Sequence, residues 1–202
     1  MHSTKLQFSP QEMALASDPH WILTKNEILQ KIGHLLGYVH QSQKNILSTA
    51  KNLLPEKVVG STPKISRGEN YKGLPHLVLD YPRLFKKNNI FAIRSLFWWG
   101  RTLSTTLHLS GEWKQTFSEK IIANYPLLSE NGFVVSIGAN EWIHDVSSDE
   151  YAKTNLLSPK GLDELITKKD FVKLALFRPV SELNNAGEVW VQQFQTIIKA
   201  LT

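Results

Sequence analysis

Residues 17–55 carry a helical pattern that is long compared with the whole chain. Apolar or small side chains recur there at alternating spacings of four and three residues, which places them on one side of a helix. These positions are Ile28, Ile32, Leu35, Val39, Ser42, Ile46, Thr49 and Leu53. An unbroken helix over residues 19–54 would be about 54 Å long at ~1.5 Å per residue, whereas a compact chain of this size has a radius of gyration of about 16–17 Å. The helix must therefore bend, break or project from the rest of the fold.

Two arrangements of this helical region are open. Gly33, Gly37 and the polar residues 40–45 are weak points at which a helix can break, and they favour two helices folded over a sheet. The alternative is a single projecting helix that pairs with a second copy of the chain, so a homodimer through the N-terminal helix is one expected assembly. Pro55 ends the helical region in either case.

After the helical region the apolar period changes to two, which is typical of strands. The strand-like segments are residues 74–82, 89–99, 102–110, 132–142 and 170–179. The later helix-like segments are residues 113–125, 158–170 and 187–202. A short turn between the second and third strands favours antiparallel pairing. The chain therefore predicts an α+β fold with a mostly antiparallel central sheet of about five strands.

We expect one domain over residues 1–202. Residues 1–55 form its helical region, residues 74–179 form the sheet with inserted helices, and residues 187–202 form a closing helix. The closing helix carries one apolar face, which packs on the sheet. That face consists of Trp190, Phe194, Ile197, Ile198 and Leu201. Residues 56–73 are irregular and cationic, and we interpret them as a mobile loop.

Four short runs of the sequence carry a resemblance to a known family. They are RGENYKGLPHLVLD at 67–80, GFVVS at 132–136, KKDFVKLALF at 168–177 and VQQFQTIIKAL at 191–201. In these runs the chain resembles the YktB-like group of uncharacterised bacterial proteins. The resemblance implies a single α+β domain and implies no chemistry. The sequence departs from the group at residues 79–85 and 97–101, and no functional residue is carried over.

The positive charge of the chain is concentrated in its middle. Residues 57–101 contain nine Lys or Arg against two acidic residues, a net charge of +7, whereas the rest of the chain contains fourteen against sixteen, a net charge of −2. Such a local excess favours an anionic partner, which could be nucleic acid, a phosphate, a carboxylate metabolite or acidic lipid. A lysine-rich surface that is only solvated is an equal alternative.

The composition excludes several classes of site. The chain contains no cysteine, which excludes disulfides, thiolate metal sites and cysteine nucleophiles, and which fits a cytoplasmic location. No stretch approaches the ~18 consecutive apolar residues of a membrane helix, so we expect no membrane partner. The sequence shows no paired-histidine metal motif, no clustered carboxylates and no glycine-rich phosphate loop. We therefore expect no metal and no cofactor.

Alternation along the strands gathers polar side chains on one face of the sheet. Arg94 and Trp98 share one side of the second strand. If the strands are neighbours, the flanking strands add further polar groups to the same face. These groups are His76, Asp80, Ser104, Thr106 and His108. The face is either open to water or covered by the N-terminal helix or by residues 56–73.

A half-buried arginine on that face needs an acceptor, because an unpaired buried charge is costly. The acceptor of Arg94 is either Asp80 or a bound anion. In the second case we predict a site for a small anionic ligand, with a tryptophan as a stacking surface and further arginines at the rim. The predicted binding residues are Arg94, His108, His76, Asp80, Trp98, Arg101 and Arg67.

An acid–base enzyme is one alternative. His108 would transfer the proton, Asp80 would orient its imidazole, and Arg94 would stabilise negative charge on a phosphorylated or carboxylated substrate. The sequence shows no clear nucleophile, so it stays open whether the protein is an enzyme. His144 and Asp145 are also an acid–base pair by type, but adjacent residues of a strand point apart, and we interpret both as structural.

Binding of single-stranded nucleic acid is the other alternative. The basic segment contains Tyr71, Tyr81, Phe85 and Trp98, and aromatic residues among cationic ones are typical of a stacking platform. The basic residues straddle several strands and turns, and no RNA-recognition signature is present. We therefore rank this function below the binding of a small anion.

Overall fold

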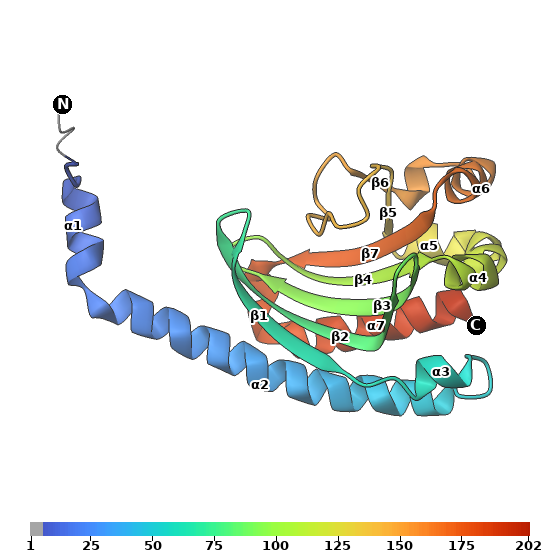
Figure 1. Cartoon of the computed structure of the whole chain (residues 1–202), viewed down its shortest axis with the longest axis horizontal. Helices are drawn as coiled ribbons and strands as arrows, with labels where there is room; N and C mark the ends of the chain where they lie inside the picture. Colours follow the sequence, from blue (N-terminus) through green and yellow to red (C-terminus); the bar gives the residue numbers. More distant parts are fainter. Residues whose placement is uncertain (1–5) are drawn as a thin grey trace.

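A seven-stranded antiparallel sheet forms the centre of the structure, a computed structural model that describes residues 6–202 (Figure 1). The strands are β1 (Lys64–Tyr71), β2 (Leu74–Lys86), β3 (Asn89–Trp98), β4 (Thr102–Ser110), β5 (Val134–Ser136), β6 (Tyr151–Lys153) and β7 (Phe171–Pro179). They lie in the order β1-β2-β3-β4-β7-β5-β6. The α+β class and the antiparallel sheet are confirmed. The prediction of about five strands is wrong, because β1 and the three-residue β6 lack a clear apolar alternation.

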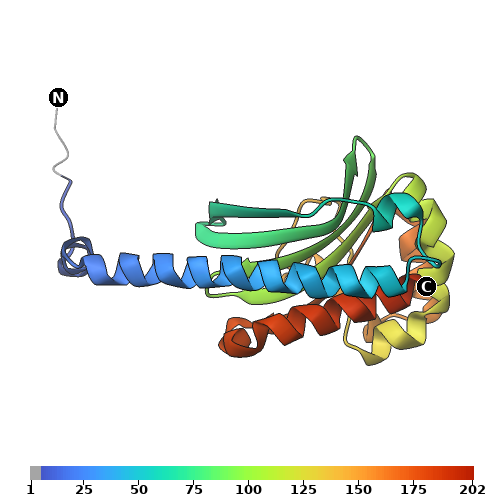
Figure 2. The ribbon, with the colours of Figure 1, turned by 90° about the horizontal axis from the view of Figure 1, so that it is seen from below.

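Helices α2 and α7 lie side by side across one face of the sheet (Figure 2). The α-helices are α1 (Pro10–Ser17), α2 (Pro19–Thr49), α3 (Glu56–Val59), α4 (Glu112–Ala123), α5 (Tyr125–Glu130), α6 (Pro159–Lys168) and α7 (Ala186–Leu201). Short 3-10 helices follow β6 at Thr154–Leu156 and β7 at Val180–Asn185. Within residues 6–202, no helix has both the length and the apolar character that a membrane crossing requires.

Helix α2 is continuous over Pro19–Thr49, so the favoured expectation of two shorter helices is wrong. Its buried side consists of Leu29, Ile32, Leu36, Val39, Gln43 and Leu47. Packing of this side against the rest of the fold outweighs the cost of about 1 kcal/mol for each interior glycine, Gly33 and Gly37. Residues 6–24, which we call the arm, extend beyond the edge of the sheet (Figure 1).

Residues 56–73 contain a helical turn and an edge strand, so their interpretation as a mobile loop is wrong. Helix α3 precedes β1, and β1 pairs with β2 in antiparallel register. Lys72 (φ 50°) and Gly73 (φ 81°) form the two-residue turn between these strands. The sheet therefore begins at Lys64 rather than at residue 74. The sequence of β1, KISRGENY, is mostly polar, and it lacks the alternation from which strands are predicted.

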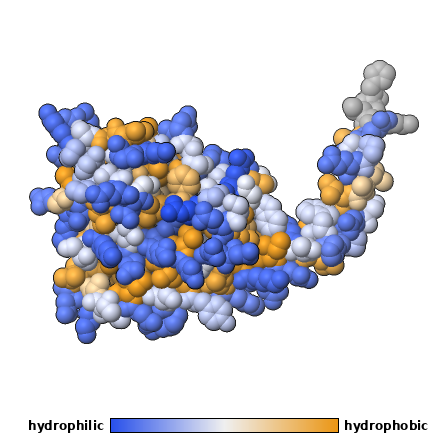
Figure 3. Space-filling view, turned by 180° about the vertical axis from the view of Figure 1, so that it is seen from behind, coloured by the Kyte–Doolittle hydropathy of each residue, from blue (hydrophilic) through white to orange (hydrophobic). Residues whose placement is uncertain are grey.

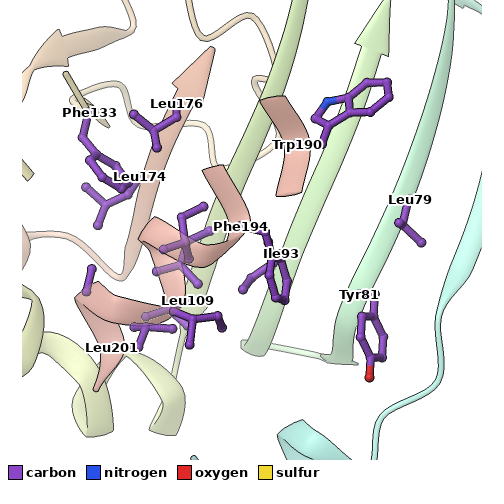
Figure 4. Packing of buried hydrophobic residues seen from close by; sticks show 14 of the residues in the cluster. Leu79, Tyr81, Ile93, Leu109, Phe133, Leu174, Leu176, Trp190, Phe194 and Leu201 are labelled. Atoms are coloured by element: carbon purple, nitrogen blue, oxygen red, sulfur yellow. The ribbon is translucent and has the colours of Figure 1, made fainter. Parts of the chain in front are cut away.

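The apolar core lies between the sheet and the helices α2, α4, α6 and α7. The strands contribute alternate residues, including Leu79, Ile93 and Leu109 (Figure 4). Trp190 and Phe194 of α7 are fully buried among them. All five residues of the predicted apolar face of the closing helix are buried, so this part of the prediction is confirmed.

Residues 137–150, which connect β5 to β6 and which we call the cover segment, lie over part of the opposite face of the sheet. The N-terminal helix packs on the apolar face and residues 56–73 supply an edge strand, so both predicted covers are wrong. The strand predicted over residues 132–142 ends at Ser136. It ends there because the next two residues both donate hydrogen bonds to the Glu150 carbonyl, at 2.9 and 3.2 Å, and turn the chain back.

Candidate functional site

The register of the sheet brings polar residues of four strands together under the cover segment. Asp80 of β2 lies opposite Arg94 of β3, and His108 of β4 lies opposite Lys173 of β7. Their side chains leave the apolar core and meet an acidic residue and a histidine of the cover segment. The resulting polar cluster consists of Asp80, Arg94, His108, Glu141, His144 and Lys173.

Arg94 forms a two-pronged ion pair with Asp80. Its Nε donates to Oδ1 of Asp80 at 2.7 Å, and its Nη2 donates to Oδ2 at 2.9 Å. Asp80 is only 5% exposed, so the carboxylate depends on this guanidinium for its charge partner. The internal carboxylate is therefore the acceptor of Arg94, which settles the alternative that the sequence left open. The remaining Nη1 lies 2.9 Å from Nε2 of His144.

His144 is held between two basic side chains. Its backbone N–H donates to the hydroxyl of Tyr71 at 2.8 Å, which anchors the cover segment to β1. Its Nε2 contacts Arg94, and its Nδ1 lies 3.3 Å from Nζ of Lys173. The sequence placed His144 on a strand next to Asp145, but residues 137–150 contain no strand, so alternation does not apply to them. Asp145 points elsewhere and pairs with Lys72 at 2.9 Å.

Lys173 is a buried lysine that is not among the predicted binding residues. It is 2% exposed, and its Nζ donates to the carbonyl of Glu141 at 2.8 Å and to that of Ile143 at 2.5 Å. A signal for it exists in the run FVKLALF, where a lysine interrupts an apolar strand. Alternation puts this lysine on the side opposite Val172 and Leu174, which is the polar face.

His108 pairs with Glu141 and not with Asp80, so the predicted His108–Asp80 pair is wrong. Nε2 of His108 lies 2.8 Å from Oε2 of Glu141. A carboxylate accepts hydrogen bonds, so Nε2 of the neutral ring carries the hydrogen and donates. The ring also packs edge-on against Trp142 and Phe171, with centroids 5.6 and 6.0 Å away.

Burial controls the charge of the cluster. Burial, together with the positive charges of Lys173 and Arg94, lowers the pKa of His108 to about 3 and that of His144 to about 2. Burial, reinforced by Arg94 and opposed by Glu141, lowers the pKa of Lys173 to about 7. Both imidazoles are therefore uncharged near neutral pH, and Lys173 changes its charge in the physiological range.

The cluster borders one small cavity and one larger cleft. The inner cavity has a volume of about 10 Å³, roughly the space of one water molecule. It is lined by Phe85, Ala92, Arg94, Thr106, His108, Trp142, His144 and Lys173. The outer cleft has a volume of about 550 Å³ and is lined by Asn88, Ser110, Gly111, Lys114, Gln115, Glu141, Asp170 and Phe171. Glu141 lies in the wall of the cleft and contacts His108, which lines the inner cavity.

The predicted residues His76 and Trp98 lie beside the cluster rather than in it. Burial lowers the pKa of His76, and its ring lies against Tyr71 and Gly68, where a Cβ would come within 2.3 Å of the imidazole. Trp98 is 1% exposed and donates through Nε1 to the Tyr71 carbonyl at 3.2 Å. Its faces are covered by protein, so it offers no stacking surface to a ligand.

The two rim arginines lie outside the cluster. Arg101 stacks over the Trp98 ring with its guanidinium carbon 5.6 Å from the centroid. Arg67 is paired with Glu69 at 2.6 Å on the exposed edge strand. Of the seven predicted binding residues, the structure therefore brings together Asp80, Arg94 and His108 and leaves four outside the cluster.

No family model matches this chain, and no curated protein or solved structure shows significant similarity to it. The resemblance to the YktB-like group therefore stays a prediction. The function has to be inferred from the chemistry of the polar cluster and of the cleft beside it.

Proposed function

We propose that the protein binds a small anionic ligand in the outer cleft, with the anionic group replacing the carboxylate of Glu141 on His108. The contact between Glu141 and His108 carries this proposal. A carboxylate already occupies the donor of His108, and the carbonyl of the same residue accepts from Lys173. Glu141 thus marks a position in which the sheet binds an anion.

The sheet side of the cluster has more donors than internal acceptors. Asp80 is engaged by Arg94 through both oxygens, which leaves His108 and Lys173 dependent on the cover segment. A buried donor without a partner costs about 1–3 kcal/mol. If Glu141 swings into the cleft, a carboxylate or phosphate that takes its place restores the lost hydrogen bonds. A neutral ligand of the same size restores fewer of these hydrogen bonds.

The size of the cleft fits a metabolite. Ligand pockets have volumes of about 300–1,000 Å³, and the outer cleft falls in this range. Lys114 in its wall adds a positive charge for a second anionic group, while Asp170 in the same wall adds a negative one. A metabolite of the cytoplasm is the expected source, since the cysteine-free sequence favours that location.

A nucleic-acid strand and a proton-transfer reaction at His108 are less well supported. Tyr81 and Trp98, two of the four aromatic residues of the stacking platform, are buried. The lowered pKa of His108, about 3, makes its imidazole a weak base at neutral pH. Both observations favour the binding of a small anion over the two alternatives.

Titration calorimetry with acetate, inorganic phosphate and pyruvate tests the proposal. Wild-type protein should bind at least one of these probes. Glu141→Ala should bind it more tightly, because the variant lacks the internal competitor, whereas Lys173→Met should bind it more weakly. Glu130→Ala on α5, an exposed acidic residue outside the cluster, is the matched control and should behave as wild type. Absence of binding, or an unchanged affinity in Glu141→Ala, would contradict the proposal.

We also propose that two copies of the chain pair through the arm. Trp21, Ile28 and Leu35 recur at seven-residue spacing along one side of α2. Trp21 is exposed on the arm, and Leu35 lines an apolar groove of about 470 Å³ between α2 and α7. In an antiparallel pair centred on Ile28, each Trp21 would lie at the groove of the other copy, and the assembly would close at two. Apolar surface continues from the body onto the arm (Figure 3).

Sedimentation equilibrium tests this assembly. Wild-type protein should be a dimer, and Trp21→Glu should be a monomer with unchanged secondary structure. Leu156→Glu, a change at another exposed apolar residue, should remain a dimer. A monomeric wild type would refute the pairing.

A further inference from the structure

The hydrogen bonds around His144 determine which of its nitrogens carries the hydrogen. Arg94 has donors only, so Nε2 of His144, 2.9 Å from Nη1, must accept. A neutral imidazole carries one N–H, which therefore lies on Nδ1. Nδ1 is 3.3 Å from Nζ of Lys173. The imidazole thus presents a donor to the lysine.

Lys173 can meet this donor only as a neutral amine. An ammonium group has three hydrogens and no lone pair, so it would oppose the N–H of His144. An amine has two hydrogens and one lone pair. Its two hydrogens match the carbonyls of Glu141 and Ile143, and its lone pair matches Nδ1–H of His144. Burial of the group, which lowers its pKa to about 7, favours the same state.

All three partners of the amine belong to the cover segment. Displacement of residues 137–150 therefore releases the lone pair of Lys173 together with the donor of His108. The two side chains are cross-strand neighbours on one face of the sheet, where Cβ atoms lie about 4.5–5.5 Å apart. A ligand that bridges them needs an anionic group and an electrophilic atom next to each other.

We propose that the anionic ligand is a 2-oxo acid and that Lys173 forms an imine with its carbonyl carbon. This step rests on the proposed function, because the carboxylate of the ligand takes the position of the Glu141 carboxylate on His108. In a 2-oxo acid the carbonyl carbon is bonded directly to the carboxylate carbon. The ligand therefore matches the adjacent positions of His108 and Lys173.

The reaction exchanges one bond for another and needs no oxidant. The lone pair of Nζ forms a bond to the carbonyl carbon, and one proton of Nζ moves to the carbonyl oxygen to give a carbinolamine. The C–O bond then breaks, the hydroxyl leaves as water with the second proton of Nζ, and a C=N bond results. The sum is one amine and one carbonyl compound giving one imine and one water.

Reductive trapping on the full chain tests the inference. Wild-type protein is incubated with pyruvate and sodium cyanoborohydride near pH 7, and the product is analysed by intact mass and peptide mapping. We expect one label per chain, on Lys173. With its pKa lowered to about 7, about half of Lys173 is amine near pH 7, against fewer than about one in a thousand for an ordinary lysine, so its labelling should exceed that of an exposed lysine by more than about 100-fold.

Lys169 is the matched control, because it is also partly buried and burial lowers its pKa. Lys169→Met should keep the label and Lys173→Met should lose it. Should a variant fail to fold, mapping of the label on wild-type protein gives the answer alone. A label spread evenly over surface lysines, or found on Lys169, would overturn the inference.

Calorimetry with pyruvate separates the proposal of imine formation from that of anion binding. Pyruvate that binds wild-type protein without being trapped contradicts imine formation and leaves anion binding in place. Pyruvate, acetate and phosphate that all fail to bind contradict both.

Discussion

Nη1 of Arg94 lies 2.9 Å from Nε2 of His144, and this contact assigns the hydrogen of the imidazole to Nδ1. Nδ1–H is the less usual tautomer of a neutral histidine, and in this protein it is the one compatible with a guanidinium partner. Through it, the charge state of Lys173 is coupled to a residue on another strand. The cluster is therefore a chain of donors and acceptors that runs from Asp80 to the cover segment.

The tautomer of His144 is directly measurable. Long-range ¹H–¹⁵N correlation spectra of ¹⁵N-labelled protein should show protonated Nδ1 and unprotonated Nε2 for His144 near neutral pH. The spectrum of His144→Gln identifies the signal by its loss. A protonated Nε2 would mean that Arg94 does not donate to the ring, and the assignment of Lys173 as an amine would lose its basis.

The buried histidines make the fold sensitive to acid. The pKa of His144 is lowered to about 2 in the folded protein, whereas the unfolded chain has the ordinary value near 6.5. Below pH ~6.5 the unfolded state therefore binds a proton that the folded state does not, and stability falls as the pH falls. Charged or titratable groups that face His144 include Arg94, Lys173 and His108. The substitution His144→Gln keeps a hydrogen-bond acceptor at this position and removes the titratable imidazole.

Urea unfolding between pH ~6.5 and ~5 checks this difference. The free energy of unfolding of wild type should fall more steeply than that of His144→Gln, by about 1.4 kcal/mol per pH unit. His20→Gln at an exposed position should follow wild type. Parallel curves for wild type and His144→Gln would show that the ring is not held neutral.

The ion pair of Arg94 and Asp80 should show strong coupling. Arg94→Met leaves a buried carboxylate without its partner and should lower the free energy of unfolding by about 3–5 kcal/mol. Asp80→Leu leaves the guanidinium unpaired and should also destabilise. The double variant removes both charges and should be much less destabilised than the sum of the single ones. Additive effects in urea denaturation would contradict a paired arrangement.

Binding of a simple anion should depend on pH through Lys173. Acetate keeps its charge between pH 6 and 8, while Lys173, with its pKa lowered to about 7, loses most of its charge over that range. The affinity for acetate should therefore fall about tenfold from pH 6 to pH 8. In Lys173→Met the affinity should be lower and nearly independent of pH. An equal dependence in both proteins would assign the effect to another group.

The elements with a clear apolar period could be predicted from the sequence. Strand β4 follows the predicted residues 102–110, and the buried face of α7 matches its predicted side. The continuity of helix α2 could not be predicted from this period. Gly33 and Gly37 lower the local stability of the helix, and packing over its whole length outweighs that loss. A local pattern identifies a helix, but not whether distant contacts keep it continuous.

The candidate site could be predicted only on its sheet side. Alternation placed Arg94, Asp80 and His108 on one face, and it would also have found Lys173 as the lone charge in FVKLALF. Glu141 lies within, and His144 just after, residues 132–142, which the sequence predicted as a strand, and nothing local indicates that this segment folds over the sheet. The predicted partner of His108 was wrong for this reason, since the actual partner, Glu141, lies 33 residues away in the chain.

The proposals of anion binding and of imine formation both depend on the charge state of Lys173, and a titration of its ¹³Cε signal by NMR measures that state most directly. Lysine labelled with ¹³C at Cε, with Lys173→Arg to identify the signal, gives the pKa of the group in the intact protein. A midpoint near pH 7 is the result that the structure predicts. A signal that does not titrate until pH ~10, the ordinary range of lysine, would show a permanent ammonium and would contradict the account of the site.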